Sequence, residues 1–246
     1  MGQVEGEPQV RYIGHQPVIR PRLNAVVPRV PEDLLEGLRT AHVPDVSDAV
    51  GAIYTMDPAI RPLYGAMPRL LGQALTVKAP PGDNLTIHGA LSMVQPGDVL
   101  VVDWRGHVAG CATGASSLVV PMTRGLRGAV VDGAWRDVAE LRALQFPICA
   151  RGLAAFSPPK DRVGEINVPV SCGGVVVSPG DLVVGDDEGV VVVPQAEARK
   201  VVAAVAGYAG PKALEDYDLP ALERGVEERR RYFERAVERA GGSLPG

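Results

Sequence analysis

The Arg-Asp pair at residues 136 and 137 is the part of this sequence best suited to chemistry. It follows a β-branched apolar run that ends in Asp132-Gly133, and it opens an expected helix that carries a second acid, Glu140, one turn further on. A cation, a carboxylate and free backbone N–H groups at the end of a strand suit an anionic substrate and a divalent metal. Ligands of open α/β sheets also tend to lie at that end of the strands. The structural alternative is that Asp137 only caps the helix and Arg136 pairs with a surface acid.

Three further segments carry groups that could face the same ligand. Gly82-Asp83-Asn84 is a turn before a helix with His88, so it either directs an amide and an imidazole at a polar ligand or simply caps that helix. The small residues of 110–117 lead into a helix whose N–H groups could hold a carboxylate. Lys160 lies in a proline-rich loop and is either a substrate cation or a solvated side chain. Neither a Walker lysine nor a Gly-x-Gly-x-x-Gly after a strand is present, which leaves nucleotide and S-adenosylmethionine sites unsupported.

The elements that must position these groups follow a β/α order. Helical spacing and capping residues predict helices over 31–40, 45–50, 85–95, 114–124, 137–144, 195–206 and 221–240. Apolar runs predict strands over 74–78, 99–103, 129–132 and 148–150, with an antiparallel or mixed β layer within 168–194 and a loop over 54–69. This order favours a single α/β domain over 29–206, with an N-terminal arm over 1–28 and a helical C-terminal arm over 207–246.

Composition narrows the class of protein further. The 246 residues carry a net charge of −4 and no basic block, so nucleic acid is not expected as a partner. No apolar run is long enough to span a bilayer, and the N-terminus lacks the charged-then-apolar order of a signal peptide, so no membrane partner is expected. Cys111, Cys149 and Cys172 show neither metal-finger nor disulfide spacing, and we expect buried thiols in a cytoplasmic protein.

Several segments occur together in an order that resembles one family. They are Val46 to Ala49, Pro81 to Asn84, Pro96 to Asp103, Arg124-Gly125, Gly128 to Asp137, Ala150 to Gly152, and Gly173 through Asp181 to Pro194. This set, which spans roughly residues 40 to 200, is similar to the RraA-like family, which includes the 4-hydroxy-4-methyl-2-oxoglutarate/4-carboxy-4-hydroxy-2-oxoadipate aldolases. The resemblance implies a β/β/α sandwich that forms homotrimers, or homohexamers of two trimers, with active sites between subunits.

The same resemblance implies a metal-dependent aldolase, often with oxaloacetate decarboxylase activity. Aldolase-like members carry Arg-Asp followed by an acid three residues after the Asp, as Arg136, Asp137 and Glu140 do here, whereas members that regulate ribonuclease E typically lack the Asp. The resemblance implies that Asp137 holds Mg²⁺ or Mn²⁺, and that Arg136 binds the 2-oxo acid and stabilises its enolate. A label of menaquinone methyltransferase, also given to some members, is not supported because the cofactor loop is missing.

The resemblance also suggests which residues surround the substrate. Backbone N–H groups of the segment Gly114-Ala115-Ser116-Ser117 would hold a substrate carboxylate, and three polar side chains match positions around the pocket: Asn84, His88 and Lys160.

Two positions depart from the family pattern. The residue after Gly114 usually carries Asp, Glu or Asn near the catalytic water, and here it is Ala115. Loss of a general acid/base group lowers a rate by about two to four orders of magnitude, unless a nearby group such as Ser116, Ser117 or Asp103 replaces it. The acid that a neighbouring subunit donates in the family has no clear match in this C-terminal sequence, although Glu227 and Glu228 are candidates.

These observations favour a divalent-metal-dependent lyase that acts on a 4-hydroxy-2-oxo acid or on oxaloacetate through a pyruvate enolate. One alternative is a non-catalytic regulator of an RNA-processing enzyme, which the missing acid at Ala115 would suit. A second alternative is another metal-dependent oxo-acid enzyme on the same scaffold.

Overall fold

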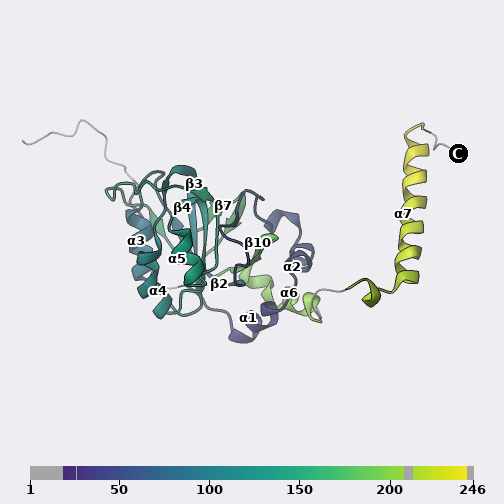
Figure 1. Cartoon of the computed structure of the whole chain (residues 1–246), viewed down its shortest axis with the longest axis horizontal. Helices are drawn as coiled ribbons and strands as arrows, with labels where there is room; N and C mark the ends of the chain where they lie inside the picture. The colour runs from purple at the N-terminus through teal and green to yellow at the C-terminus, as the bar shows by residue number, and fades with distance from the viewer. Residues whose placement is uncertain (1–18, 26, 208–212, 243–246) are drawn as a thin grey trace, which may run out of the picture. The chain divides into compact units, whose positions relative to one another are not determined.

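The computed structural model describes residues 19–25, 27–207 and 213–242 (Figure 1). The chain divides into two compact units, one up to Gly207 and one from Tyr208 onward. The predicted helical arm over 207–246 begins next to this division, and most of the predicted N-terminal arm lies outside the described residues.

The first unit is built around one large sheet. Its described strands run in the order β1-β5-β4-β3-β2-β9-β10, with β6 pairing to β2. The central strands β2 (Leu70–Lys78), β3 (Asp98–Cys111), β4 (Gly128–Trp135) and β5 (Ile148–Leu153) are parallel. The antiparallel strands at the margins are β1 (Arg61–Pro62), β6 (Glu165–Ile166), β9 (Leu182–Asp186) and β10 (Gly189–Val193). A separate hairpin of β7 (Val170–Cys172) and β8 (Val175–Val177) lies against β2, β3 and β4.

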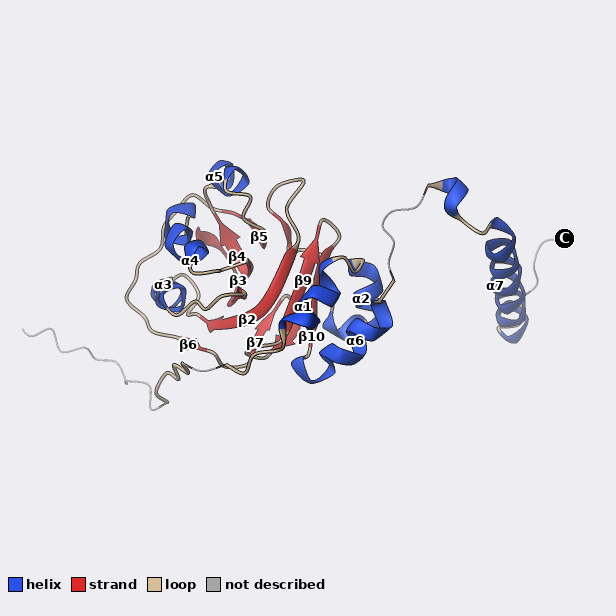
Figure 2. Cartoon of the chain, turned by 90° about the horizontal axis from the view of Figure 1, so that it is seen from below, coloured by secondary structure: helices blue, strands red, loops and turns tan. Residues whose placement is uncertain are grey.

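Helices complete the layers. Strands β2 to β5 advance across the sheet in one direction, so right-handed crossovers place their connecting helices on one face. These helices are α3 (Leu85–Ser92), α4 (Val119–Thr123) and α5 (Val138–Ala143), and they lie together in Figure 2. At β9 and β10 a second group packs, formed by α1 (Glu32–Arg39), α2 (Val43–Val50) and α6 (Ala198–Val205) (Figure 2). Short 3₁₀ helices are η1 (Ala52–Tyr54), η2 (Ala115–Leu118), η3 (Gln195–Glu197) and η4 (Leu214–Asp216).

Two apolar clusters hold the first unit together. The larger one joins the parallel strands to α3, α5 and the β7–β8 hairpin, with Ile87, Leu141 and Trp135 fully buried in it. The smaller one buries Leu38 and other residues of α1, α2 and α6 against β9 and β10. Burial of an aliphatic or aromatic side chain contributes about 1.5–3 kcal/mol, so this aliphatic core fixes the strand ends on which the site depends.

The predicted α/β class is confirmed, and several predicted bounds change. The strand predicted over 99–103 continues to Cys111, because a turn at Arg105 (φ 56°) and Gly106 (φ 71°) lets the chain rejoin the ladder. The helix predicted over 114–124 divides into η2 and α4. The β layer predicted within 168–194 is wrong as one layer: β9 and β10 extend the main sheet, and only β7 and β8 form a separate pair. The loop predicted over 54–69 contains Tyr54, the last residue of η1, and the short strand β1.

The part of the predicted N-terminal arm that the structure describes is attached to the first unit. Leu23 forms a bridge to Ile166, and Asn24 exchanges hydrogen bonds with Asn167 through side chains and backbone. The second unit contains α7 (Leu219–Arg239), which Pro220 opens in its first turn, where the missing N–H costs nothing. Among the described helices, none combines the length and the apolar character that a membrane crossing needs.

Candidate functional site

The predicted site residues follow the carboxyl ends of the four parallel strands. Asn84 and His88 come after β2, Ala115 comes after β3, Asp137 comes after β4, and Lys160 comes after β5. The helices α3 and α5 both contact η2, so the segments after β2, β3 and β4 meet at one edge of the sheet. This is the edge at which open α/β sheets bind their ligands.

Asp137 is held in an unusual backbone conformation by the segment after β3. Its φ of 62° and ψ of 44° are left-handed, a region that Asp tolerates better than most residues. Its side chain makes no capping bond to α5, which removes the structural alternative for this residue. Instead, Oδ2 accepts a hydrogen bond of 2.9 Å from the backbone N–H of Ala115. The carboxylate is thus aimed across the strand ends rather than along its own helix.

Gly114 makes room for this arrangement. A Cβ at this position would collide with Oδ2 of Asp137 and would lie 3.0 Å from Nε of Arg136. The φ of Gly114 is −121°, so the requirement comes from space rather than from backbone conformation. The glycine at position 114 therefore has a physical reason on this chain, which is to leave space for the Asp137 carboxylate.

Arg136 lies beside the carboxylate and keeps donor capacity. Its Nε is 3.7 Å from Oδ2 of Asp137, an ion pair rather than a hydrogen bond, and this buried nitrogen has no hydrogen-bond partner among the described residues. One terminal nitrogen reaches the backbone oxygen of Ala155 at 3.5 Å, the outer limit for a hydrogen bond. A fork with unused N–H groups next to a carboxylate suits a substrate that carries a carboxylate or a 2-oxo oxygen.

Asn84 is fully buried at the start of α3. Its Nδ2 donates to the backbone oxygen of Ala112 at 3.0 Å, whereas its Oδ1 has no hydrogen-bond partner in the part of the chain that the structure describes. The preceding Asp83 is also buried and fastens the loop after β5, because its Oδ2 accepts the N–H groups of Asp161 and Arg162. Burial raises the pKa of Asp83, but its backbone hydrogen bonds and Arg162 more than offset this and hold the pKa below its ordinary value. Asp83 is therefore the group that brings Lys160 toward α3.

The charge of Lys160 acts on His88. Burial lowers the pKa of His88, and the positive charge of Lys160 lowers it further. His88 is therefore a neutral imidazole near pH 7, able both to donate and to accept a hydrogen bond.

Cys111 is the residue of this region that sequence reasoning missed. Its thiol is buried at the end of β3, and burial raises its pKa above the ordinary value, an effect that Arg136 and Lys160 offset only in part. The electrostatic effects of Arg136, Asp137 and Lys160 on one thiol indicate that these three charged side chains lie near Cys111. Only a pattern that aligned the ends of β3 and β4 could have revealed this, because Cys111 has no motif of its own.

The segment 114–117 offers fewer free donors than expected. The N–H of Ala115 donates to Asp137, and the N–H of Ser117 donates to the oxygen of Gly114 at 3.2 Å. Within the described part of the chain, the N–H of Ser116 has no protein acceptor. The predicted carboxylate cradle is thus partly committed to holding Asp137.

The donor set for a metal is small. No group of three or more His, Cys, Asp or Glu side chains that could hold a metal occurs within residues 19–25, 27–207 and 213–242. Asp137 supplies one carboxylate, and Glu140 on α5 is exposed. One carboxylate suits Mg²⁺ or Mn²⁺, which often keep several waters and take further ligands from the substrate. It would not make a closed structural zinc site.

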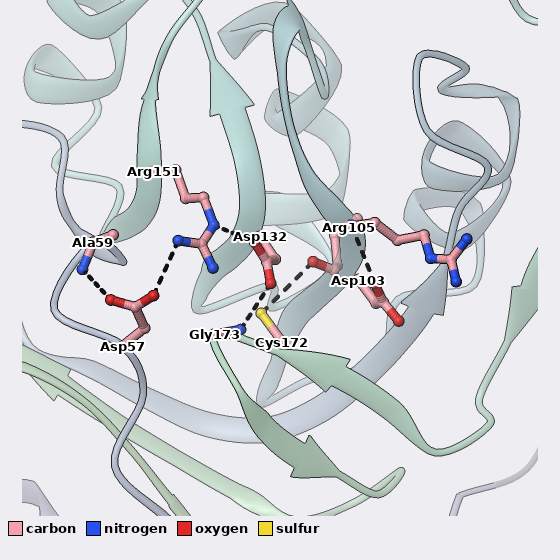
Figure 3. Close-up of polar contacts among 9 residues, drawn as sticks. Asp57, Ala59, Asp103, Arg105, Asp132, Arg151, Cys172 and Gly173 are labelled. Atoms are coloured by element: carbon pink, nitrogen blue, oxygen red, sulfur yellow. Dashed lines mark hydrogen bonds and ion pairs between the residues drawn. The ribbon is translucent and has the colours of Figure 1, made fainter.

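A second polar cluster is formed by side chains of β3, β4 and β5 together with the loop before β1 and the turn between β7 and β8 (Figure 3). Arg151 pairs with Oδ1 of Asp132 and, at 3.2 Å, with Asp57. The other oxygen of Asp132 accepts the N–H of Gly173 at 3.0 Å. These bonds join β4 and β5 to the loop before β1 and to the β7–β8 hairpin.

Asp103 belongs to this second cluster and not to the group around Asp137. It stands opposite Asp132 in the ladder, and its oxygens accept the N–H group of Arg105 at 3.2 Å, drawn in Figure 3, and that of Ser171 at 3.4 Å. These two bonds engage both oxygens of the Asp103 carboxylate, and the replacement by Asp103 of the acid missing at Ala115 stays a prediction. Ser116 is exposed and Ser117 is half-buried beside Ala115, and neither side chain is engaged in a hydrogen bond in the described part of the chain.

Comparison with known proteins places the chain in a family. The profile of the RraA-like family, described as Aldolase/RraA, matches residues 40–192. A protein of Halalkalibacterium halodurans named "Putative 4-hydroxy-4-methyl-2-oxoglutarate aldolase" is 39% identical over 170 residues, which cover 69% of this chain and 80% of the relative. A Burkholderia multivorans protein of the same name is 35% identical over 144 residues, covering 58% of this chain and 87% of the relative.

Among solved structures, Streptomyces coelicolor RraAS2, described as an unusual member of the RNase ES inhibitor RraA protein family, is similar in fold and sequence. It shares 30% identity at a TM-score of 0.65, over 72% of this chain and 92% of that chain. With residues 40–192 matched by the family profile, with relatives of this identity and with this shared fold, the chain belongs to the RraA-like family.

Proposed function

We propose that the protein is a divalent-metal-dependent lyase that forms a pyruvate enolate from 4-hydroxy-2-oxo acids or from oxaloacetate. The observation that carries the proposal is the placement of Asp137, whose carboxylate is turned away from its own helix and held by Ala115 beside the unused Nε of Arg136. A merely structural Asp would cap α5. The names of the two aldolase-like relatives support the same class of reaction.

Asp137 would hold Mg²⁺ or Mn²⁺ through one carboxylate, with water and substrate as the remaining ligands. When bound, this cation would supply Lewis-acid stabilisation of the negative charge that develops on the 2-oxo oxygen. Arg136 would donate to the same oxygen or to the adjacent carboxylate through its unpaired N–H groups. The N–H of Ser116 and the side chains of Asn84, His88 and Lys160 would bind the remaining polar groups of the substrate.

The two candidate reactions differ in what they ask of the residue at position 115. In aldol cleavage the C4 hydroxyl must lose a proton, the C3–C4 bond breaks, and its electron pair forms the enolate. In oxaloacetate decarboxylation the same bond breaks with loss of CO₂, and no hydroxyl proton has to be removed. Ala115 has no group that could take this proton. We therefore expect decarboxylation to be retained better than aldol cleavage.

The proposed assembly is a homotrimer or a homohexamer with sites between subunits. The acid expected from a neighbouring subunit would then complete each site, with Glu227 and Glu228 as candidates on α7.

The proposal is tested by pyruvate release from oxaloacetate and from 4-hydroxy-4-methyl-2-oxoglutarate. The protein is stripped with EDTA and assayed without metal, with Mg²⁺ and with Mn²⁺. We expect turnover that EDTA abolishes and either metal restores. Absence of turnover with both substrates, or turnover indifferent to EDTA, would contradict the proposal. Turnover of other 2-oxo acids alone would favour a different metal-dependent enzyme on this scaffold.

A regulator of RNA processing is the second candidate. The observation that favours it is the similarity to RraAS2 together with the missing acid at Ala115. This candidate predicts that Asp137→Ala leaves inhibition of an RNase E-type enzyme unchanged. Loss of a metal-dependent lyase activity in the same variant would favour the enzyme.

A further inference from the structure

Within the second unit, the helix α7 presents an apolar stripe that no other described residue of that unit covers. The stripe consists of Leu219, Leu222, Val226, Phe233 and Val237, and the C-cap residue Ala240 extends it. No residue of α7 is buried, and Leu222, Val226 and Phe233 are 48%, 57% and 57% exposed. The opposite side of the helix is charged. The helix lies outside residues 40–192, which match the family profile.

The spacing of this stripe is the same in both directions. Read from Leu219 to Ala240, the steps between apolar positions are three, four, seven, four and three residues. The midpoint falls between Arg229 and Arg230. Two copies of the helix laid antiparallel about that midpoint would therefore set Leu222 of each against Val237 of the other, and Val226 against Phe233. A two-fold interface requires this self-complementarity, in which residue i meets j and j meets i.

The charges of α7 favour the same orientation. Residues 219–229 carry three Glu and two Arg, a net charge of −1, whereas residues 230–240 carry four Arg and two Glu, a net charge of +2. An antiparallel pair sets each half against the half of opposite sign, and a parallel pair would set like against like.

Arg230, one of the two arginines beside the midpoint, is compatible with this pairing. Nε of Arg230 lies 3.0 Å from Oε1 of Glu234, and a terminal nitrogen lies 4.0 Å from Oε1 of Glu227. Its charge is thus already compensated on its own helix, so it flanks the apolar stripe as an ion-paired side chain whose stem covers apolar surface.

We propose that α7 is a homotypic docking element that pairs antiparallel with α7 of a second copy of this chain. Pairing of α7 helices would join two identical oligomers of the first unit into one assembly of twice the mass. A stripe of this length would give only a weak affinity between two isolated helices. Several such pairs between the same two assemblies would strengthen the association, because the first pair raises the effective concentration for the others.

Cysteine cross-linking of the full-length chain tests the orientation. The native cysteines are all buried, so added thiols report on α7. Differently tagged Val226→Cys and Phe233→Cys chains are mixed and oxidised under mild conditions. The antiparallel pair predicts a disulfide between the two variants. It predicts none between two copies of either variant, because identical positions then lie about 10 Å apart along the axis, beyond disulfide reach. Disulfides between identical positions, cross-links to the first unit, or no disulfide at all would each overturn the proposal.

The mass of the assembly provides the second measurement. The full-length Val226→Glu/Phe233→Glu variant is expected to fall to half the wild-type mass in analytical ultracentrifugation, because a charge now lies in the stripe. Arg224→Glu is the matched control on the charged face and should keep the wild-type mass. An unchanged mass of the double variant, with α7 still helical by circular dichroism, would also overturn the proposal.

Discussion

The backbone N–H of Ala115 donates a hydrogen bond of 2.9 Å to Oδ2 of Asp137, and this bond joins the segment after β3 to the segment after β4. The donor is the backbone of a residue whose methyl side chain can act as neither acid nor base. The position after Gly114 thus keeps a structural task, which is to aim the carboxylate, even though the side chain contributes no acid or base. The backbone of residue 115 and its side chain therefore have separate roles: the backbone N–H orients Asp137, and only the side chain could supply an acid or base.

Gly114→Ala should damage the site without damaging the fold. The added Cβ would collide with Oδ2 of Asp137, so the carboxylate must move, whereas the φ of −121° is available to alanine. Displacement of a catalytic group by about 1 Å can cost about a hundredfold in rate, and we expect a loss of pyruvate formation of that order. Steady-state kinetics and the melting temperature of each variant provide the measurement.

Gly152→Ala is the control for this substitution, because a Cβ there meets nothing within 4 Å. It should leave both the rate and the melting temperature near the wild-type values. A Gly114→Ala variant with wild-type turnover would show that the position of Asp137 does not matter to the reaction.

Ala115→Asp should raise aldol cleavage relative to decarboxylation. The backbone N–H that holds Asp137 is retained, and the new carboxylate can take the C4 hydroxyl proton. General-base catalysis contributes about 10²–10⁴-fold, so we expect kcat/KM for 4-hydroxy-4-methyl-2-oxoglutarate to rise by about tenfold or more. The value for oxaloacetate should change little. Equal changes for the two substrates would contradict the role assigned to this position, and Ala115→Asn serves as the uncharged control.

Lys160→Met should raise the pKa of His88. Burial lowers this pKa first and Lys160 lowers it further, so removal of the cation takes away the second cause. NMR titration of the imidazole, with His88→Gln used to assign its signal among the four histidines, measures the change. An unchanged midpoint would mean that Lys160 does not face His88 in solution.

The same shift has a defined effect on stability. The folded-state pKa of His88 lies below the unfolded value of about 6.5, so the unfolded state binds more protons in this range. The stabilising contribution of neutral His88 to the free energy of unfolding is complete above about pH 6.5, and it is lost as the pH falls through the folded-state pKa. Lys160→Met should reduce that loss.

Arg151→Met should destabilise the fold through the second cluster. It removes the cation from Asp132, a carboxylate that is 7% exposed and would keep only the N–H of Gly173. Removal of one partner from a buried ion pair costs about 3–5 kcal/mol; because Arg151 is partly exposed, we expect about 3 kcal/mol or less in urea denaturation.

The double variant Arg151→Met/Asp132→Asn provides the internal check. It removes both charges and should recover part of the lost stability, as expected when an unpaired charge is the cause. If the double variant is no more stable than Arg151→Met, the loss comes from packing of the arginine stem instead. Arg61→Met, on an exposed arginine of β1, should change the free energy of unfolding by no more than about 0.5 kcal/mol.

Local pattern was sufficient to predict the parallel strands and the helices between them. Apolar runs such as Val99–Val102 are buried on both faces, and their sequence carries that signal directly. The extension of β3 to Cys111 was not predictable, because it depends on a turn in which Arg105 takes a positive φ that its residue type does not favour. The assignment of β9 and β10 to the main sheet depends on pairing between β2 and β9, which are more than a hundred residues apart.

The site was predictable in part for the same reason. Arg136 and Asp137 follow a strand with a clear pattern, so their place at the strand end could be expected. The contact of Asp137 with Ala115, the space left by Gly114 and the position of Cys111 depend on how neighbouring strand ends meet. The diversion of Asp103 into a cluster with Asp132 also depends on strand register, in which the two residues stand opposite each other.

If the Asp137 carboxylate holds the metal of a lyase, Asp137→Asn should remove most of the pyruvate-forming activity. Asparagine tolerates the left-handed backbone and can still accept the N–H of Ala115, so the fold and the local geometry should persist. Pyruvate formation from oxaloacetate is measured for wild type and variant over a range of Mg²⁺ concentrations, with melting temperature as the check on folding. We expect a Mg²⁺-dependent activity in the wild type that falls by about a hundredfold or more in the folded variant. An Asp137→Asn variant with wild-type turnover and wild-type Mg²⁺ dependence would contradict it.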